Sequence, residues 1–177
     1  MTVQCVGCGA AVPDIDGPTH RYMTSAPACW QRYGELLNAF HARPTQISAS
    51  IMCVDTYAIQ HPGTPNPQAI RSVAVHLLNL YSYLVLGRPV NIPQVTFPGK
   101  ALPSTKAPPL TDPFWLEPPS FAGRLTVFDV PVDGTGDAIA FAARSWAESV
   151  WDAWSAHHRQ IEQWYARYAT VSARTHR

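Results

Sequence analysis

The chain has 177 residues, of which 46% are hydrophobic and 14% are charged. This balance is typical of a globular domain with a sizeable core and excludes a disordered chain. The formal net charge is only +1, which argues against a nucleic-acid or anionic-membrane surface because such surfaces need clustered Lys and Arg. We therefore expect a single domain over residues 1–177 whose partner is a small-molecule substrate, with no nucleic acid and no membrane.

The N-terminal residues contain no basic segment followed by an apolar one, so we expect no signal peptide. The most apolar stretch, residues 72–86, is interrupted by His76 and Asn79 and is shorter than the ~20 residues of a membrane span. These features predict a cytoplasmic protein with reduced cysteines. In that setting a Cys-x-x-Cys pair more often binds metal or does redox work than forms a structural disulfide.

Residues 1–30 are predicted to form a loop-rich head that contains a zinc knuckle. Cys5 and Cys8 are separated by two residues and followed by Gly9. This spacing lets two thiolates reach one Zn²⁺ ion, and the glycine lets backbone N–H groups approach the sulfurs. The alternative is that both cysteines are free thiols in a flexible tail.

Several residues could supply the ligands that complete the knuckle. Cys29 supplies a third thiol, and His20 can complete a Cys₃His set. Cys53 and His61 remain open as alternatives for the fourth position. A nucleophilic role for Cys53 is a further alternative, but its apolar neighbours favour an inert buried thiol.

Apolar residues recur at helical spacing in four segments, which therefore predict four helices. Pro27 suits the first turn of the first helix, Ser48 can cap the second, and Pro62 ends the second. The first three helices occupy most of residues 31–88, and the last is long and rich in Trp. The predicted helices cover residues 26–42, 48–60, 67–86 and 137–172.

Four polar residues interrupt or border these apolar stripes, namely Asp55, His61, His76 and His157. Burying an isolated carboxylate is costly, so convergence of the four residues would remove much of the penalty. It would also perturb their pKa values, as catalytic groups require. The alternative is that each is satisfied separately, with Asp55 bonded to an Arg, Tyr or Trp donor and His61 acting as a helix cap.

A Pro-rich arm follows over residues 89–131. Two strand-like segments, 94–97 and 124–130, can pair as a short β-ribbon. The arm either covers a site as a lid or simply packs through Phe114 and Trp115. The fold class that follows is mainly α: a four-helix-bundle-like domain with an N-terminal zinc-knuckle head and a short β-ribbon in the Pro-rich connection.

Six short motifs span nearly the whole chain: Cys-x-x-Cys-Gly at 5–9, Asp-Gly-Pro-Thr-His at 16–20, Cys-Trp at 29–30, Val-Asp-Thr-Tyr-Ala-x-Gln-His-Pro at 54–62, Val-His-Leu at 75–77 and Trp-x-x-Trp-x-x-His-His at 151–158. Together they resemble an uncharacterised bacterial family, common in actinomycetes and known mainly as a domain of unknown function. The resemblance implies a single-domain protein whose Cys and His residues belong to the family pattern. It implies no reaction.

Two functions fit these observations. The first is a zinc-dependent enzyme, a hydrolase, lyase or transferase, in which the Asp and His residues line a pocket and zinc activates water for hydrolysis or a related addition. The second is a non-catalytic, zinc-stapled binding module that uses the Trp-rich helix and the Pro-rich arm. Convergence of the four polar residues in one pocket favours the enzyme, and separate satisfaction favours the module.

Overall fold

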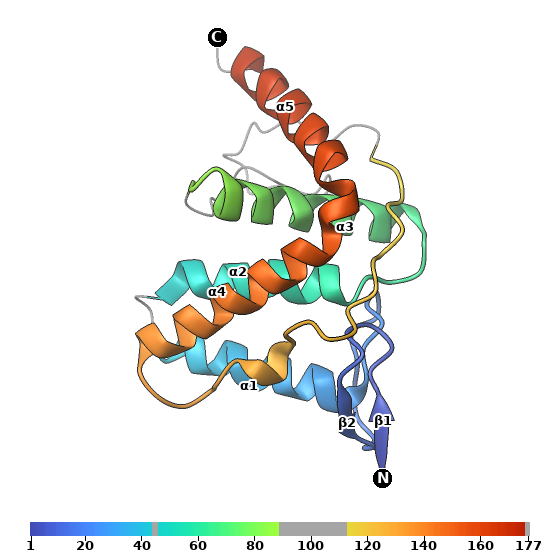
Figure 1. Cartoon of the computed structure of the whole chain (residues 1–177), viewed down its shortest axis with the longest axis vertical. Coiled ribbons are helices and arrows are strands. Elements are labelled where there is room, and N and C mark those ends of the chain that lie inside the picture. Colours follow the sequence, from blue (N-terminus) through green and yellow to red (C-terminus); the bar gives the residue numbers. More distant parts are fainter. Residues whose placement is uncertain (44–45, 89–112, 176–177) are drawn as a thin grey trace.

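Helices dominate the computed structural model, which describes residues 1–43, 46–88 and 113–175, with side chains up to residue 167 (Figure 1). The mainly helical prediction is confirmed. The principal helices are α1 (Pro27–His41), α2 (Ile47–Gln60), α3 (Pro67–Leu80), α4 (Gly136–Ala153) and α5 (His158–Thr175). The shorter elements are β1 (Thr2–Gln4), β2 (Ala11–Pro13), a π-helical turn η2 (Tyr81–Val85) and two 3₁₀ turns, η4 (Val127–Asp129) and η5 (Trp154–His157).

Helix α2 is the centre of the fold. It lies between α1 and α3, and α4 crosses it, so it is surrounded by helices (Figure 1). Every residue from Thr56 to Gln60 is buried, as expected of a helix enclosed by neighbours. Polar side chains on α2 must therefore find partners inside the protein. No helix within the described ranges is long and apolar enough to cross a membrane.

The helix starts follow different local rules. Pro27 occupies the first turn of α1, as predicted. Helix α3 begins at Pro67, also as predicted. The Asn66 side chain caps it by accepting hydrogen bonds from the backbone N–H groups of Gln68 and Ala69. The predicted cap at Ser48 is wrong, because α2 begins one residue earlier and has no side-chain cap.

The β-ribbon lies in the head, where β1 and β2 form an antiparallel hairpin. Of the two predicted strands, 94–97 lies outside the described residues, and 124–130 is not a strand. Thr126 instead caps η4: its hydroxyl accepts from Phe128 N–H at 3.3 Å, and its own N–H donates to Asp129 at 2.7 Å. This reciprocal capping box outweighs the β-propensity of the segment.

The last helix is interrupted, contrary to the single helix predicted over residues 137–172. After α4 the chain tightens into η5 and then continues as α5. The His158 side chain donates to the carbonyl of Trp151 at 3.0 Å, and its ring stacks on that indole. A side chain inserted into the helical hydrogen-bond ladder is a known cause of such breaks. The break redirects every later residue, including α5, which extends to the top of the view in Figure 1.

Candidate metal centre

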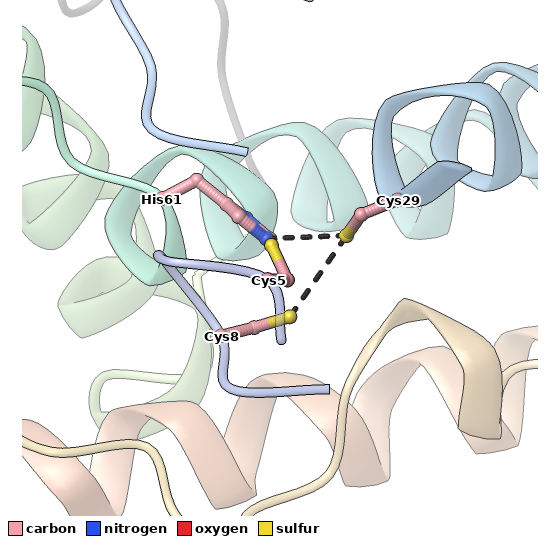
Figure 2. A group of neighbouring side chains, drawn as sticks. All are labelled: Cys5, Cys8, Cys29 and His61. Atoms are coloured by element: carbon pink, nitrogen blue, oxygen red, sulfur yellow. Dashed lines mark hydrogen bonds between the residues drawn. The ribbon is translucent and has the colours of Figure 1, made fainter. Parts of the chain in front are cut away.

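Four buried side chains converge where the head meets the ends of two helices (Figure 2). Cys5 and Cys8 lie on the turn between β1 and β2, Cys29 is the third residue of α1, and His61 directly follows α2. One ligand atom from each residue lies within 4.8 Å of all the others. These four residues, here called the Cys₃His cluster, are the only such group of three or more in the described part of the chain.

The spacing within the Cys₃His cluster suits a tetrahedral ion. Cys8 Sγ lies 3.8 Å from Cys29 Sγ, and Cys29 Sγ lies 3.3 Å from His61 Nε2. Zn–S bonds of ~2.3 Å and Zn–N bonds of ~2.0 Å place neighbouring tetrahedral ligands about 3.5–3.8 Å apart. The Cys8–Cys29 distance matches this spacing, the Cys29–His61 distance is slightly shorter, and all four ligand atoms lie within 4.8 Å of one another.

The His61 ring is oriented by the helix that precedes it. Its Nδ1 lies 2.9 Å from the carbonyl oxygen of Tyr57, and its face stacks on the Tyr57 ring. Because a carbonyl can only accept, Nδ1 must carry the proton and Nε2 presents its lone pair to the Cys29 sulfur. This arrangement, in which a backbone carbonyl fixes the tautomer of a ligating histidine, is common around protein metal sites.

The electrostatics of the cluster call for a cation. Hydrogen bonds from Cys29 and Cys8 hold the pKa of Cys5 far below its usual range, and the backbone N–H of Ala26 also donates to Cys5 Sγ at 3.4 Å. The pKa of Cys29 is raised far above its usual range by its hydrogen bonds with Cys5 and Cys8 and by burial. Three sulfurs brought together in a buried site disfavour one another's ionisation, so holding all three as thiolates would need a positive ion.

Gly7 lets the knuckle turn dock closely. A Cβ built at this position would collide with the carbonyl oxygen of Thr24 and with the imidazole of His61. Thr24 also donates its backbone N–H to His61 O at 3.3 Å. The turn, the segment before α1 and the end of α2 are therefore packed directly on one another.

His20 is not part of the Cys₃His cluster, so the predicted Cys5, Cys8, Cys29 and His20 set is corrected at one position. The His20 ring packs against Trp30, and its Nδ1 accepts from the backbone N–H of Tyr22 at 3.3 Å. His61 takes the fourth position, as one of the alternatives allowed. Cys53 stays outside: it is fully buried on α2, and burial and nearby Asp55 raise its pKa.

A second polar group joins α2 to α3. Asp55 Oδ1 accepts from His76 Nδ1 at 2.6 Å and from Asn79 Nδ2 at 3.0 Å. Asp55 is only 2% exposed, and its Oδ2 has no hydrogen-bond partner among the described residues. The sequence analysis missed Asn79, although its position three residues after His76 places both side chains on one face of α3.

The predicted convergence of Asp55, His61, His76 and His157 in one cluster is wrong for two members. His61 faces the cysteines. His157 Nε2 donates to the carbonyl oxygen of Glu117 at 2.9 Å, because the η5 turn rotates it out of the stripe that a continuous helix would have kept. The structure therefore brings together Asp55 and His76 and satisfies the other two residues elsewhere.

Residues 3–155 match the model of a family of unknown function, DUF5946, and the chain belongs to that family. No curated protein and no solved structure gave a match. The resemblance to a domain of unknown function is confirmed, and the function must be argued from the geometry of the sites.

Proposed function

We propose that this member of DUF5946 is a zinc-stapled binding module, in which the Cys₃His cluster holds Zn²⁺ and a separate surface takes a small-molecule partner. The observation that carries the proposal is the convergence of the four buried ligand atoms within 4.8 Å of one another. No other group of described residues offers a comparable set of ligands.

Zinc is the metal that suits this donor set. Soft thiolates with one imidazole select zinc among the common divalent ions, and tetrahedral sulfur-rich sites are typical of structural zinc. All four positions would be filled by Cys5, Cys8, Cys29 and His61, so no position is left open for a substrate or an activated water. A closed site of this kind supports a structural role over a catalytic one.

The hairpin of the head buries few apolar side chains of its own. All three residues of β1 are exposed, and in β2 only Val12 is buried. Such a hairpin is not expected to be stable alone. Metal binding would thus contribute directly to its folding and would fasten it to α1 and α2.

The arrangement of the other polar residues supports a module over a metal-dependent enzyme. His61 and His157 each have their own partners, and the Asp55–His76 pair lies apart from the zinc ligands. Metal chemistry on a small molecule would need ionisable groups beside an open metal position. The enzyme hypothesis is therefore confined to the Asp55–His76 pair.

The proposal is tested by the zinc content of the purified protein, prepared without chelator. We expect about one Zn²⁺ per chain in the wild type and far less in His61→Asn and Cys29→Ala, because each removes one of the four ligands. The matched controls are His20→Asn and Cys53→Ala, which should keep the wild-type zinc content. Zinc retained in His61→Asn but lost in His20→Asn would overturn the ligand set, and a metal-free wild type would overturn the proposal.

A general base is the second candidate, favoured by the 2.6 Å bond between Asp55 and His76. A carboxylate on Nδ1 orients the imidazole and leaves Nε2 to accept a proton from a substrate. We would screen wild type and His76→Ala for hydrolysis of small esters and amides. Loss of activity in His76→Ala with unchanged zinc content would support this role. Equal activity in both proteins would exclude it.

A further inference from the structure

A cavity of about 310 Å³ lies beside the Cys₃His cluster. One wall comes from the knuckle turn, with Val6 and Gly7, and from the segment after α2 that begins with Pro62. The opposite wall comes from the arm, with Trp115 and Phe121. The volume is at the small end of the range for ligand pockets, about 300–1,000 Å³.

The chemistry of the lining is apolar with a single charge. Among the described residues that line the cavity, Glu117 is the one with an ionisable side chain, and the others are mainly prolines, two aromatic residues, glycines and threonines. Trp115 Nε1 donates to Glu117 Oε2 at 3.2 Å, which orients the carboxylate, and the Glu117 side chain is exposed to solvent. The wall formed by the arm thus offers an indole and a carboxylate that are joined by a hydrogen bond.

His157 anchors the arm that carries this charge. Its Nε2–H donates to the backbone carbonyl oxygen of Glu117 at 2.9 Å, which ties the arm to η5. His157 does not line the cavity. It is therefore a positioning residue for the wall opposite the knuckle turn.

We infer that this cavity binds a small organic ammonium ion with an apolar body, an inference that rests on the proposed function because one wall is the metal knuckle. An ammonium group is attracted both by the Glu117 carboxylate and by the face of Trp115, since Trp is the best cation–π partner. The prolines of both walls restrict the backbone and reduce the ordering cost of binding. A neutral or anionic ligand of the same shape gains neither interaction.

The site depends on the metal through its first wall. Gly7 packs on the His61 ring, and Pro62 directly follows that ligand. Removing zinc would free the knuckle turn and open the cavity. The proposal therefore includes a coupling: ammonium binding is strong in the zinc-loaded protein and weak after chelation.

The experiment compares 2-phenylethylammonium with neutral 2-phenylethanol by titration calorimetry on the zinc-loaded full-length protein. We expect the cation to bind at least about tenfold more tightly, and Glu117→Gln to weaken its binding by about tenfold or more, as for loss of a charge-assisted contact. Gln keeps an acceptor for Trp115 but removes the charge. Glu148→Gln, an exposed glutamate on α4, is the matched control and should leave the Kd unchanged.

Zinc content is measured on the same samples, so a failure of the ammonium-site inference can be told apart from a failure of the zinc proposal. Absent or equal binding of the two ligands at full zinc occupancy would overturn the ammonium site and leave the zinc proposal intact. Loss of binding in Glu148→Gln to the same extent as in Glu117→Gln would also overturn it. Tighter binding of Nα-acetyl-lysine methylamide than of 2-phenylethylammonium would reassign the site from a free small cation to a lysine of another protein.

Discussion

Removing His76 should destabilise the protein more than removing the buried carboxylate that it contacts. Asp55 is only 2% exposed, and its Oδ2 already has no partner among the described residues; in His76→Leu it keeps only the bond from Asn79. Removing the partner of a buried carboxylate costs about 3 kcal/mol or more, because the desolvation of the carboxylate is then no longer offset. Since one bond to Asp55 remains, we expect a loss near the lower limit, about 3 kcal/mol.

The reverse substitution should cost much less. Asp55→Leu fills a similar volume and removes the group that is expensive to bury. The side chain of His76 is 14% exposed and Asn79 is also partly exposed, so both can turn to water. We expect a loss of about 1 kcal/mol or less, because replacing a buried polar group by an apolar one of similar shape is often nearly neutral.

The assay is thermal and urea unfolding followed by circular dichroism, with the zinc concentration held equal for all proteins. For a chain of this size, 1 kcal/mol shifts the Tm by about 2–4 °C, so His76→Leu should melt about 6–12 °C below the wild type. The double variant Asp55→Leu/His76→Leu should recover most of that loss. An Asp55→Leu protein less stable than His76→Leu would refute the reasoning.

Other consequences can be checked with simple variants and reagents. Chelation should make three of the four thiols reactive to a disulfide reagent, whereas Cys53 should react only on unfolding, because burial and Asp55 raise its pKa; reaction of all four in the folded protein would contradict this. Gly7→Ala should lower zinc content, because its Cβ collides with the backbone and with a ligand ring, whereas Gly34→Ala, which meets nothing within 4 Å, should not. Thr126→Ala should cost about 1 kcal/mol through loss of the η4 cap, measured as the shift in urea midpoint at constant slope.

The sequence predicted the helices well because their signals are local. Apolar spacing and the prolines at positions 27 and 67 mark helix starts within the segment itself. The signal at 124–130 is also local: Thr126 and Asp129 form a capping box, which is present in the sequence and overrides the β-propensity of the neighbouring β-branched residues.

The candidate site was only partly predictable, because one of its ligands is distant in sequence. Cys5 and Cys8 are recognisable from their spacing alone. The choice between His20 and His61 depends on how α2 packs against the head, which no periodicity reveals. The position of His157 was predicted wrongly for a different reason. The last helix is broken where the His158 side chain bonds to the carbonyl of Trp151, and such a break changes the direction in which the later side chains point.

The contacts of α2 imply that the protein opens in two independent steps. Its C-terminal end is followed by His61 of the Cys₃His cluster, whereas Asp55 within the helix bonds to His76, and Gln60, its last residue, accepts a buried hydrogen bond from Trp146. Local unfolding of the β1–β2 hairpin would leave both of these hydrogen bonds intact. Amides in the head should therefore exchange with solvent through a small local opening, while those of α2 and α3 report the global transition, as separate cooperative units do. The metal concentration would then set how long the head stays folded, but not how long the helical body stays folded.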